Sequence, residues 1–226
     1  MAHVFMTGGT GFLGGSLVRS LLSRGHRVRA LVRAHSKGRV PAGCETVEGD
    51  ALDCATYRDA IRPADTFVQL VGVSHPSPAK ASLFRSIDLA AAKEAVNAAT
   101  HAGIRHFVYV SVAHPAPVMK EYIAARSEAE EFIRASALDA TILRPWYVLG
   151  PGRRWPLLLT PVFWALGVLP PTRDSARRLG LVTRSQMVET MALAVEQPPS
   201  GVRVLEVPQI RAASLEGDSH QLVLAR

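Results

Sequence analysis

The feature that most constrains this 226-residue chain is a cluster of glycines close to its beginning. Gly9, Gly11 and Gly14 fit the pattern G-x-G-x-x-G, and Gly8 extends it to G-x-x-G-x-x-G. Glycines in such a turn permit backbone angles that side chains disfavour, and they let the main chain approach a pyrophosphate closely. The last glycine allows the following helix to pack tightly on its strand. The pattern therefore predicts a phosphate-binding turn between a strand and a helix.

Both flanks of the glycine turn have the character that a dinucleotide site requires. Residues 4–6 form an apolar run typical of a strand, and leucines recur at near-helical spacing from about residue 12 to the stop at Gly25. The start of that helix would offer unpaired N–H groups and a positive dipole end to phosphates. We therefore favour a dinucleotide site over a purely structural turn. Its predicted cofactor-binding residues are Gly8, Gly9, Thr10, Gly11, Phe12, Leu13 and Gly14.

The remaining chain alternates strands and helices, which is typical of a doubly wound parallel sheet, the Rossmann NAD(P)-binding fold of the α/β class. The expected strands cover residues 26–33, 45–48, 65–73, 105–112, 139–148 (interrupted at Pro145) and 201–207. The expected helices cover residues 83–102, 119–136 and 186–195. We predict one domain over residues 1–211, with a cofactor-binding core at 1–148, a small substrate or partner lobe at 149–211, and a tail at 212–226.

Bulk composition excludes several function classes. The sequence is 48% hydrophobic, which is enough for a sizeable core, and it shows no secretory signal and no apolar run long enough to span a membrane. Two cysteines and scattered histidines predict no metal site. The net charge of +7 comes without a nucleic-acid-binding module, so we expect solvated basic faces and no nucleic acid. We expect a cytoplasmic protein, and its oligomeric state stays open.

The apolar stretch at residues 155–169 has two interpretations. The simpler is a helix that packs over the cofactor cleft, because the run is shorter than a membrane span. The alternative is a greasy substrate tunnel or a peripheral membrane contact through residues 153–171, which arginines flank.

The residue that follows the second strand bears on the choice of cofactor. An NAD-preferring site carries an acidic residue about 20 residues past the glycines, whereas this chain has Arg33 there. The planar guanidinium can pair with a 2′-phosphate, so we expect NADP, with NAD as the alternative. Asp50 is either a turn residue or a contact to the adenine edge. Strand ends face the ligand in such sheets, which adds Ala51, Val71, Gly72 and Val73 to the predicted cofactor-binding residues.

Three segments together resemble the short-chain dehydrogenase/reductase superfamily: the glycine turn, Tyr-Val-Ser at 109–111, and Leu-Arg-Pro-Trp-Tyr-Val-Leu-Gly-Pro-Gly at 143–152. The chain is most similar to the extended and atypical branches, which include NmrA-like proteins, nucleotide-sugar epimerase-like proteins and a Rossmann-type accessory subunit of respiratory complex I. The resemblance covers about residues 1–210, and it places Pro145 near the cofactor.

The resemblance also implies a catalytic set, in which a Ser or Thr is followed by Tyr-x-x-x-Lys on a helix. Ser111 takes the first place as a substrate hydrogen-bond donor, and Tyr122 takes the second as acid/base. Arg126 stands where the lysine belongs. It keeps the charge and the helical face, but its fork is larger and always protonated, so the exchange is not conservative. A Tyr-Arg pair on a surface helix without catalytic function is the structural alternative.

These observations predict an NAD(P)-binding, oxidoreductase-like protein that prefers NADP(H) and reduces a small or apolar carbonyl or quinone. The second hypothesis is a non-catalytic NAD(P)H-binding sensor or assembly factor, because atypical relatives often lack the full catalytic set. The third is a sugar-nucleotide epimerase or dehydratase, which the short lobe disfavours.

Overall fold

The computed structural model describes residues 1–151 and 178–213 of the chain, and its centre is a seven-stranded sheet. All neighbouring strands in this sheet are parallel, in the order β3-β2-β1-β4-β5-β6-β9. The strands are β1 (His3–Thr7), β2 (Arg27–Val32), β3 (Glu45–Glu48), β4 (Thr66–Gln69), β5 (His106–Val110), β6 (Asp139–Arg144) and β9 (Val202–Glu206). The order reverses next to β1, so the predicted doubly wound α/β fold is confirmed.

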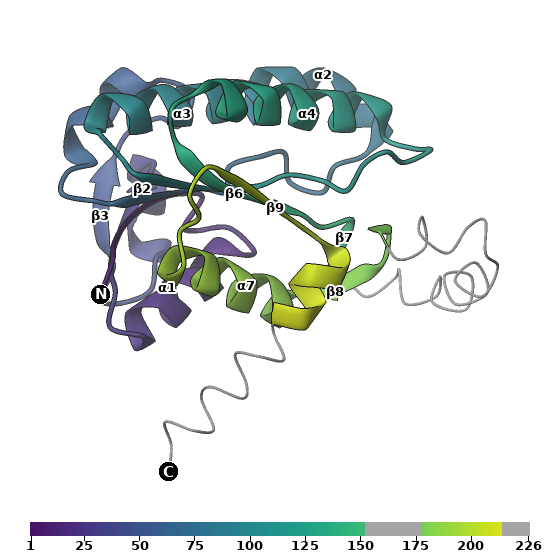
Figure 1. Cartoon of the computed structure of the whole chain (residues 1–226). Coiled ribbons are helices and arrows are strands. Elements are labelled where there is room, and N and C mark those ends of the chain that lie inside the picture. Colours follow the sequence, from purple (N-terminus) through teal and green to yellow (C-terminus); the bar gives the residue numbers. More distant parts are fainter. Residues whose placement is uncertain (152–177, 214–226) are drawn as a thin grey trace, which may run out of the picture.

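Helices cover both faces of the sheet (Figure 1). One face carries α2 (Ala81–Leu83), a π-helical segment at Phe84–Leu89, α3 (Ala90–Ala102) and α4 (Lys120–Ala135). The opposite face carries α1 (Gly14–Ser23) and α7 (Arg184–Glu196), which pack against each other. Helix α3 ends at Gly103, whose φ of 73° gives the left-handed C-cap that the sequence predicts.

Two apolar clusters fill the spaces between the sheet and its helices. Under α3 and α4, Phe5, Phe67 and Phe107 form a row across three neighbouring strands, with ring centroids 5.3 and 5.4 Å apart. Under α1 and α7, Leu17 and Met191 are completely buried. Strands that are buried on both faces read as continuous apolar runs, which is why most of them could be located from the sequence.

One strand is much shorter than predicted. The sequence indicates a strand over residues 65–73, but β4 ends at Gln69. Beyond it the chain leaves the sheet, and the backbone N–H of Val73 donates to the carboxylate of Asp88 at 2.9 Å instead of to a neighbouring strand. Similarly, the expected helix over 83–102 begins at Ala81 and contains the π-helical segment. The apolar run thus continues past the strand because those residues line a cavity.

The segment after β6 is interrupted at Pro145 as predicted, and a second, two-stranded parallel sheet follows from β7 (Tyr147–Leu149) and β8 (Leu181–Thr183). Within the predicted 149–211 lobe, β9 joins the main sheet and α7 packs on α1. The lobe as a separate unit stays a prediction. Residues 207–213 are helical, so the last residue of the expected strand and the first two residues of the expected tail belong to a helix.

The apolar stretch 155–169, the proposed contact segment 153–171 and most of the tail lie outside the described residues. Among the helices of the described ranges, none combines the length and the apolar character that crossing a membrane requires.

Candidate functional site

The glycine turn between β1 and α1 is closed by its own backbone. Gly8 has a φ of +73°, and its carbonyl accepts from the N–H of Gly11 at 2.9 Å. A Cβ on Gly14 would collide with the carbonyl oxygen of Gly8 and would lie 2.8 Å from the Cα of Gly9. Gly14 is thus required by the turn itself more than by the packing of helix on strand. A Cβ on Gly9 would lie 3.0 Å from the Cβ of Ala30.

Helix α1 begins without a side-chain cap. Its N-cap residue is Leu13, whose side chain cannot accept a hydrogen bond, and the first turn contains no acidic residue. The helix begins two residues later than the sequence indicates, which leaves Phe12 and Leu13 in the turn. An uncapped helix start presents N–H groups and a positive dipole end, which is the chemistry that binds a pyrophosphate.

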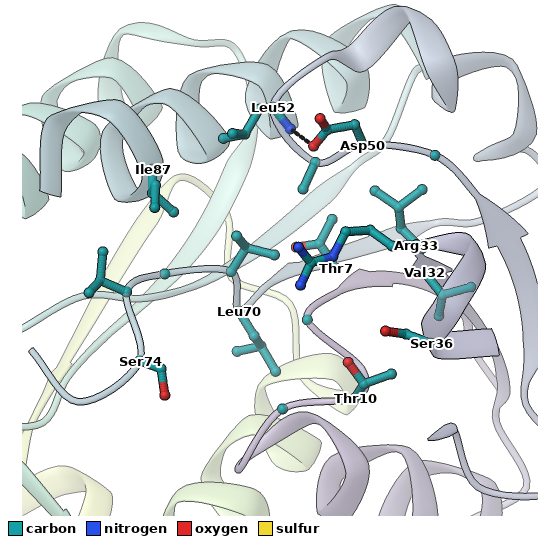
Figure 2. Close-up of a pocket in the computed structure, with 18 of the residues that line it drawn as sticks. Thr7, Thr10, Val32, Arg33, Ser36, Asp50, Leu52, Leu70, Ser74 and Ile87 are labelled. Carbon is teal, nitrogen blue, oxygen red and sulfur yellow. Dashed lines mark hydrogen bonds between the residues drawn. The ribbon is translucent and has the colours of Figure 1, made fainter. Parts of the chain in front are cut away.

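An outer cavity of about 530 Å³ opens beside this turn, at the carboxyl ends of β1, β2 and β4 (Figure 2). It is lined by Thr7, Gly8, Thr10, Gly11, Leu31, Val32, Arg33, Ser36, Gly49, Asp50, Ala51, Leu52, Leu70, Val71, Gly72, Val73, Ser74, Lys80, Leu83 and Ile87. The position agrees with the rule that ligands of open α/β sheets bind where the strand order reverses.

Arg33 points into this outer cavity. Figure 2 shows its guanidinium extending inward, with Asp50 toward one side and Thr10 and Ser36 toward the other. Arg33 is exposed, and its guanidinium makes no hydrogen bond or ion pair with the part of the chain that the structure describes. Ser36 is buried and stands at the cavity wall, although the sequence analysis did not identify it. A free cation beside two hydroxyls is an arrangement that can receive a phosphate.

Asp50 lies at the rim of the outer cavity, where its carboxylate accepts from the N–H of Leu52 at 2.9 Å. Its local role is therefore that of a turn residue, and the side chain of Asp53 caps the following 3-10 turn by accepting from the N–H of Ala55. The apolar side chains of Leu52, Leu83 and Ile87 face the same cavity. They offer an apolar slot of the kind that takes a flat ring.

An inner cavity of about 300 Å³ adjoins the outer one, and the residues that line both are Gly8, Gly11, Leu70, Gly72, Val73 and Ser74. Its lining residues are Gly8, Gly11, Phe12, Leu13, Gly14, Leu70, Gly72, Val73, Ser74, His75, Pro76, Val110, Ser111, Val112, Tyr122, Arg126, Pro145, Trp146, Tyr147 and Val148. The structure thus brings every predicted site residue except Gly9 to one of two adjoining cavities. Their roles in binding and catalysis stay predictions.

Arg126 is held by a buried ion pair. Its Nη2 lies 2.6 Å from a carboxylate oxygen of Asp88, and the exposed fractions of the two side chains are 9% and 0%. Its Nη1 donates to the carbonyl of Val110 at 2.7 Å and to the hydroxyl of Tyr109 at 3.3 Å. A Cβ on Gly72 would collide with Nη2, so the cavity loop runs directly over this pair. Arg126 thus lines the inner cavity with its charge already compensated.

The electrostatics of Arg126 follow from this burial. Desolvation alone would lower the pKa of Arg126, but Tyr109, Tyr122 and Asp88 around it raise that pKa above its ordinary value. For Tyr109, burial has the opposite sign: it raises the pKa of the phenol to about 12, although the nearby charge of Arg126 lowers it. Arg126 is therefore a permanent cation, and Tyr109 is a neutral hydrogen-bonding partner.

Ser111 is also engaged by a buried carboxylate. Its hydroxyl donates to Glu130 at 2.6 Å, and both residues are at most 3% exposed. The same carboxylate accepts from the Nε of Arg144 at 2.9 Å and pairs with its Nη2 at 2.5 Å. The sequence analysis missed Glu130, although its spacing gave a signal: it stands four residues past Arg126 and eight past Tyr122, on the same helical face.

Tyr122 is the third residue of α4 and is half-buried. Its ring contacts Phe84, with centroids 4.9 Å apart, and lies under the guanidinium of Arg126 at 5.2 Å. These contacts fix the ring at the wall of the inner cavity. Its hydroxyl makes no hydrogen bond within the described ranges, so it is the predicted catalytic group that no neighbour has engaged.

No cluster of three histidine, cysteine or carboxylate side chains that could hold a metal ion occurs within residues 1–151 and 178–213. The two cavities bring together the glycine turn, the uncapped start of α1, the guanidinium of Arg33 and the hydroxyl of Tyr122.

Comparison with known proteins agrees with this geometry. A family described as NAD(P)H-binding matches residues 8–153. Ceramide reductase from Caulobacter vibrioides is 32% identical over 177 residues, which is 77% of this chain and 55% of that protein. Photosystem II assembly factor Ycf39 from Synechocystis is 28% identical over 145 residues, 63% of this chain and 44% of that protein. The chain thus spans about half the length of these curated relatives.

Among solved structures, the enzyme WbmH from Bordetella bronchiseptica in complex with NAD+ superposes with a TM-score of 0.68. The match covers 91% of this chain and 75% of that one at 21% identity, so it shows a shared fold.

Proposed function

The chain belongs to the NAD(P)H-binding family of the short-chain dehydrogenase/reductase superfamily, and on that premise we propose an NADP(H)-preferring reductase of a small or apolar carbonyl or quinone. The observation that carries the cofactor preference is Arg33, a cation that points into the outer cavity and pairs with nothing in the described part of the chain. Thr10 and Ser36 supply hydroxyl groups beside it.

The cofactor half of the site fits a dinucleotide on three independent grounds. The Gly8 turn and the uncapped start of α1 offer N–H groups to a pyrophosphate. The apolar slot at the outer cavity suits an adenine ring. Arg33 can meet a 2′-phosphate bidentately, and charge-assisted hydrogen bonds of this type contribute about 1.5–3 kcal/mol.

The test of the cofactor preference is a titration of the protein with NADPH and NADH, followed by nicotinamide fluorescence. We expect Arg33→Asp to weaken NADPH binding roughly 10- to 100-fold, with a much smaller effect on NADH. Arg27→Asp is the matched control, because it makes the same charge change at the opposite, exposed end of β2. Equal losses for both cofactors, or an equal effect of the control, would refute the assignment.

The proposed chemistry rests on Tyr122. The bound nicotinamide would supply hydride, and Tyr122 would exchange a proton with the carbonyl or hydroxyl of the substrate. We expect Tyr122→Phe to lower turnover by roughly 10²- to 10⁴-fold at unchanged NADPH affinity. Tyr57→Phe removes the same hydroxyl from a buried residue that lines neither cavity, and it should leave turnover intact. Assays would use NADPH oxidation by a panel of aldehydes, ketones and quinones.

A second candidate function is a non-catalytic NAD(P)H-binding sensor or assembly factor. It is favoured by the ion pair of Arg126 with Asp88 and by the bond of Ser111 to Glu130, because both groups of the expected catalytic set are already engaged. A relative named as an assembly factor is consistent with it. This function predicts tight NADPH binding, no turnover on any compound, and no effect of Tyr122→Phe on a partner interaction that NADPH changes.

A further inference from the structure

The hydroxyl of Ser111 has only one proton, and the structure shows where it goes. The oxygen lies 2.6 Å from Glu130, which is the length of a charge-assisted O–H···O⁻ bond. A serine hydroxyl can donate once and accept twice. Because Ser111 donates its hydroxyl proton in the hydrogen bond to Glu130, it has no proton left to donate to a ligand. In any hydrogen bond with a ligand in the inner cavity, the serine oxygen is therefore the acceptor.

Glu130 is an ionised acceptor in this arrangement. Burial would raise the pKa of Glu130, but the bonds from Arg144 and Ser111, together with the nearby Arg144 and His114, lower it below its usual range. Arg134 adds a second guanidinium, 3.4 Å from the carboxylate of Glu130. An ionised carboxylate can accept hydrogen bonds but cannot donate one. Glu130 therefore cannot reverse the direction of its hydrogen bond with Ser111, whereas an amide could do so by presenting its NH₂ group.

We propose that Glu130 is a positioning residue that fixes Ser111 as a hydrogen-bond acceptor, so that the inner cavity prefers an alcohol over the corresponding ketone. The inference deepens the proposed function, since the alcohol is the substrate or product of the same reaction at the same site. A ligand hydroxyl can donate to the serine oxygen. A carbonyl brings only lone pairs to it, so no hydrogen bond forms between the carbonyl oxygen and the serine oxygen.

This assignment corrects the role expected from the sequence, where Ser111 is a donor to the substrate. In the described part of the inner cavity, the hydroxyl that remains free to donate is that of Tyr122. A ketone oxygen can accept from Tyr122 but not from Ser111, whereas an alcohol can bond to both.

The test measures two affinities in complexes that cannot react. Protein loaded with NADPH is titrated with cyclohexanol, and protein loaded with NADP+ is titrated with cyclohexanone, both by ligand-observed NMR. Each variant is compared with the wild type for each probe, so the difference between the two cofactor forms cancels. Ser111→Ala should weaken cyclohexanol roughly 2- to 10-fold, the range of one neutral hydrogen bond, and should leave cyclohexanone unchanged.

Glu130→Met removes the acceptor and frees the proton of Ser111, so it should tighten cyclohexanone and weaken cyclohexanol. Ser111→Thr keeps a hydroxyl and should keep the wild-type preference. If Glu130→Met does not fold, the two serine variants still decide the question. Ser136→Ala is the control: its hydroxyl donates to the carbonyl of Ile133 at the far end of α4, away from the cavity, and its loss should move neither affinity.

Equal changes of both affinities in Ser111→Ala would overturn the inference, because a purely structural role affects both probes alike. No binding of the alcohol to cofactor-loaded protein would overturn it too. In all these cases the proposed cofactor site stands. Failure of NADPH itself to bind would instead refute the proposed function, and this inference with it.

Discussion

The buried pair of Asp88 and Arg126 offers the sharpest test of how the site is held together. It joins three segments: the cavity loop through Val73, the π-helical segment that carries Asp88, and α4. We expect that removing either charge leaves the other buried without compensation. Arg126→Met and Asp88→Asn are the suitable changes, since both keep nearly the original volume.

The magnitude follows from the burial of the two side chains, which are 9% and 0% exposed. Breaking a buried ion pair on one side costs about 3–5 kcal/mol. Domains are stable by only about 5–15 kcal/mol, so each single variant should lose a large part of the free energy of unfolding. With a urea m-value of about 2 kcal/mol/M, a loss of 4 kcal/mol lowers the midpoint by about 2 M.

The assay is a double-mutant cycle in urea, followed by circular dichroism. The double variant has neither charge, so its cost should be smaller than the sum of the single costs by about 0.5–3 kcal/mol. Glu45→Gln is the control. It breaks an ion pair with Arg29 of similar length, 2.7 Å, but with exposed fractions of 61% and 30%, and should cost at most about 1 kcal/mol. Additive losses, or single losses no larger than the control's, would refute the reasoning.

Three further predictions concern single positions. Gly14→Ala should abolish NADPH binding in the fluorescence titration, because its Cβ would collide with the backbone of the turn. Gly15→Ala is the control and should bind NADPH normally, because the nearest atom to its Cβ would lie 3.6 Å away. Gly72→Ala should weaken NADPH and lower the urea midpoint, since its Cβ would collide with the guanidinium below the loop. Burial, aided by Arg203, lowers the pKa of His106 to about 4. Between about pH 6.5 and pH 4, the unfolded chain therefore binds more protons at this residue than the folded chain does, and the free energy of unfolding falls as the pH drops through that window. From pH 7 to pH 5, the wild type should lose about 2 kcal/mol more of its free energy of unfolding than His106→Gln loses. Urea unfolding at several pH values measures this, and an equal loss in the two proteins would contradict the prediction.

Much of the fold could be predicted from the sequence because its strands are buried on both faces. Such strands are continuous apolar runs, and glycines mark where the helices end. The prediction was wrong at the end of β4, where residues 70–73 are apolar for another reason. They line the cavities, and the backbone that a sheet would have paired is bonded to a side chain far along the chain. Periodicity cannot distinguish these two causes of an apolar residue.

The candidate site could be located from the sequence, but its internal bonds could not. Each predicted residue except Gly9 lines a cavity, since strand ends and the glycine turn meet at one edge of the sheet. Asp88 and Glu130 were missed because an acidic residue on a helix is usually solvated. Glu130 stands in the run Ser-Glu-Ala-Glu-Glu at 127–131, and only the packing of α4 on β5 and β6 decides which of these carboxylates is buried.

The two carboxylates also bear on what the inner cavity can accept. Among the described residues that line it, Arg126 is the one arginine or lysine, and Asp88 compensates its charge. The outer cavity holds Arg33, and Lys80 also lines it, where its ammonium donates to the backbone carbonyls of Ser74 and His75. A neutral ring or a small neutral substrate therefore suits the inner cavity, whereas a sugar nucleotide brings a second pyrophosphate that needs cations of its own. For an epimerase or dehydratase, those cations would have to come from outside the described lining of the inner cavity, so the third hypothesis needs basic groups there that the reductase does not.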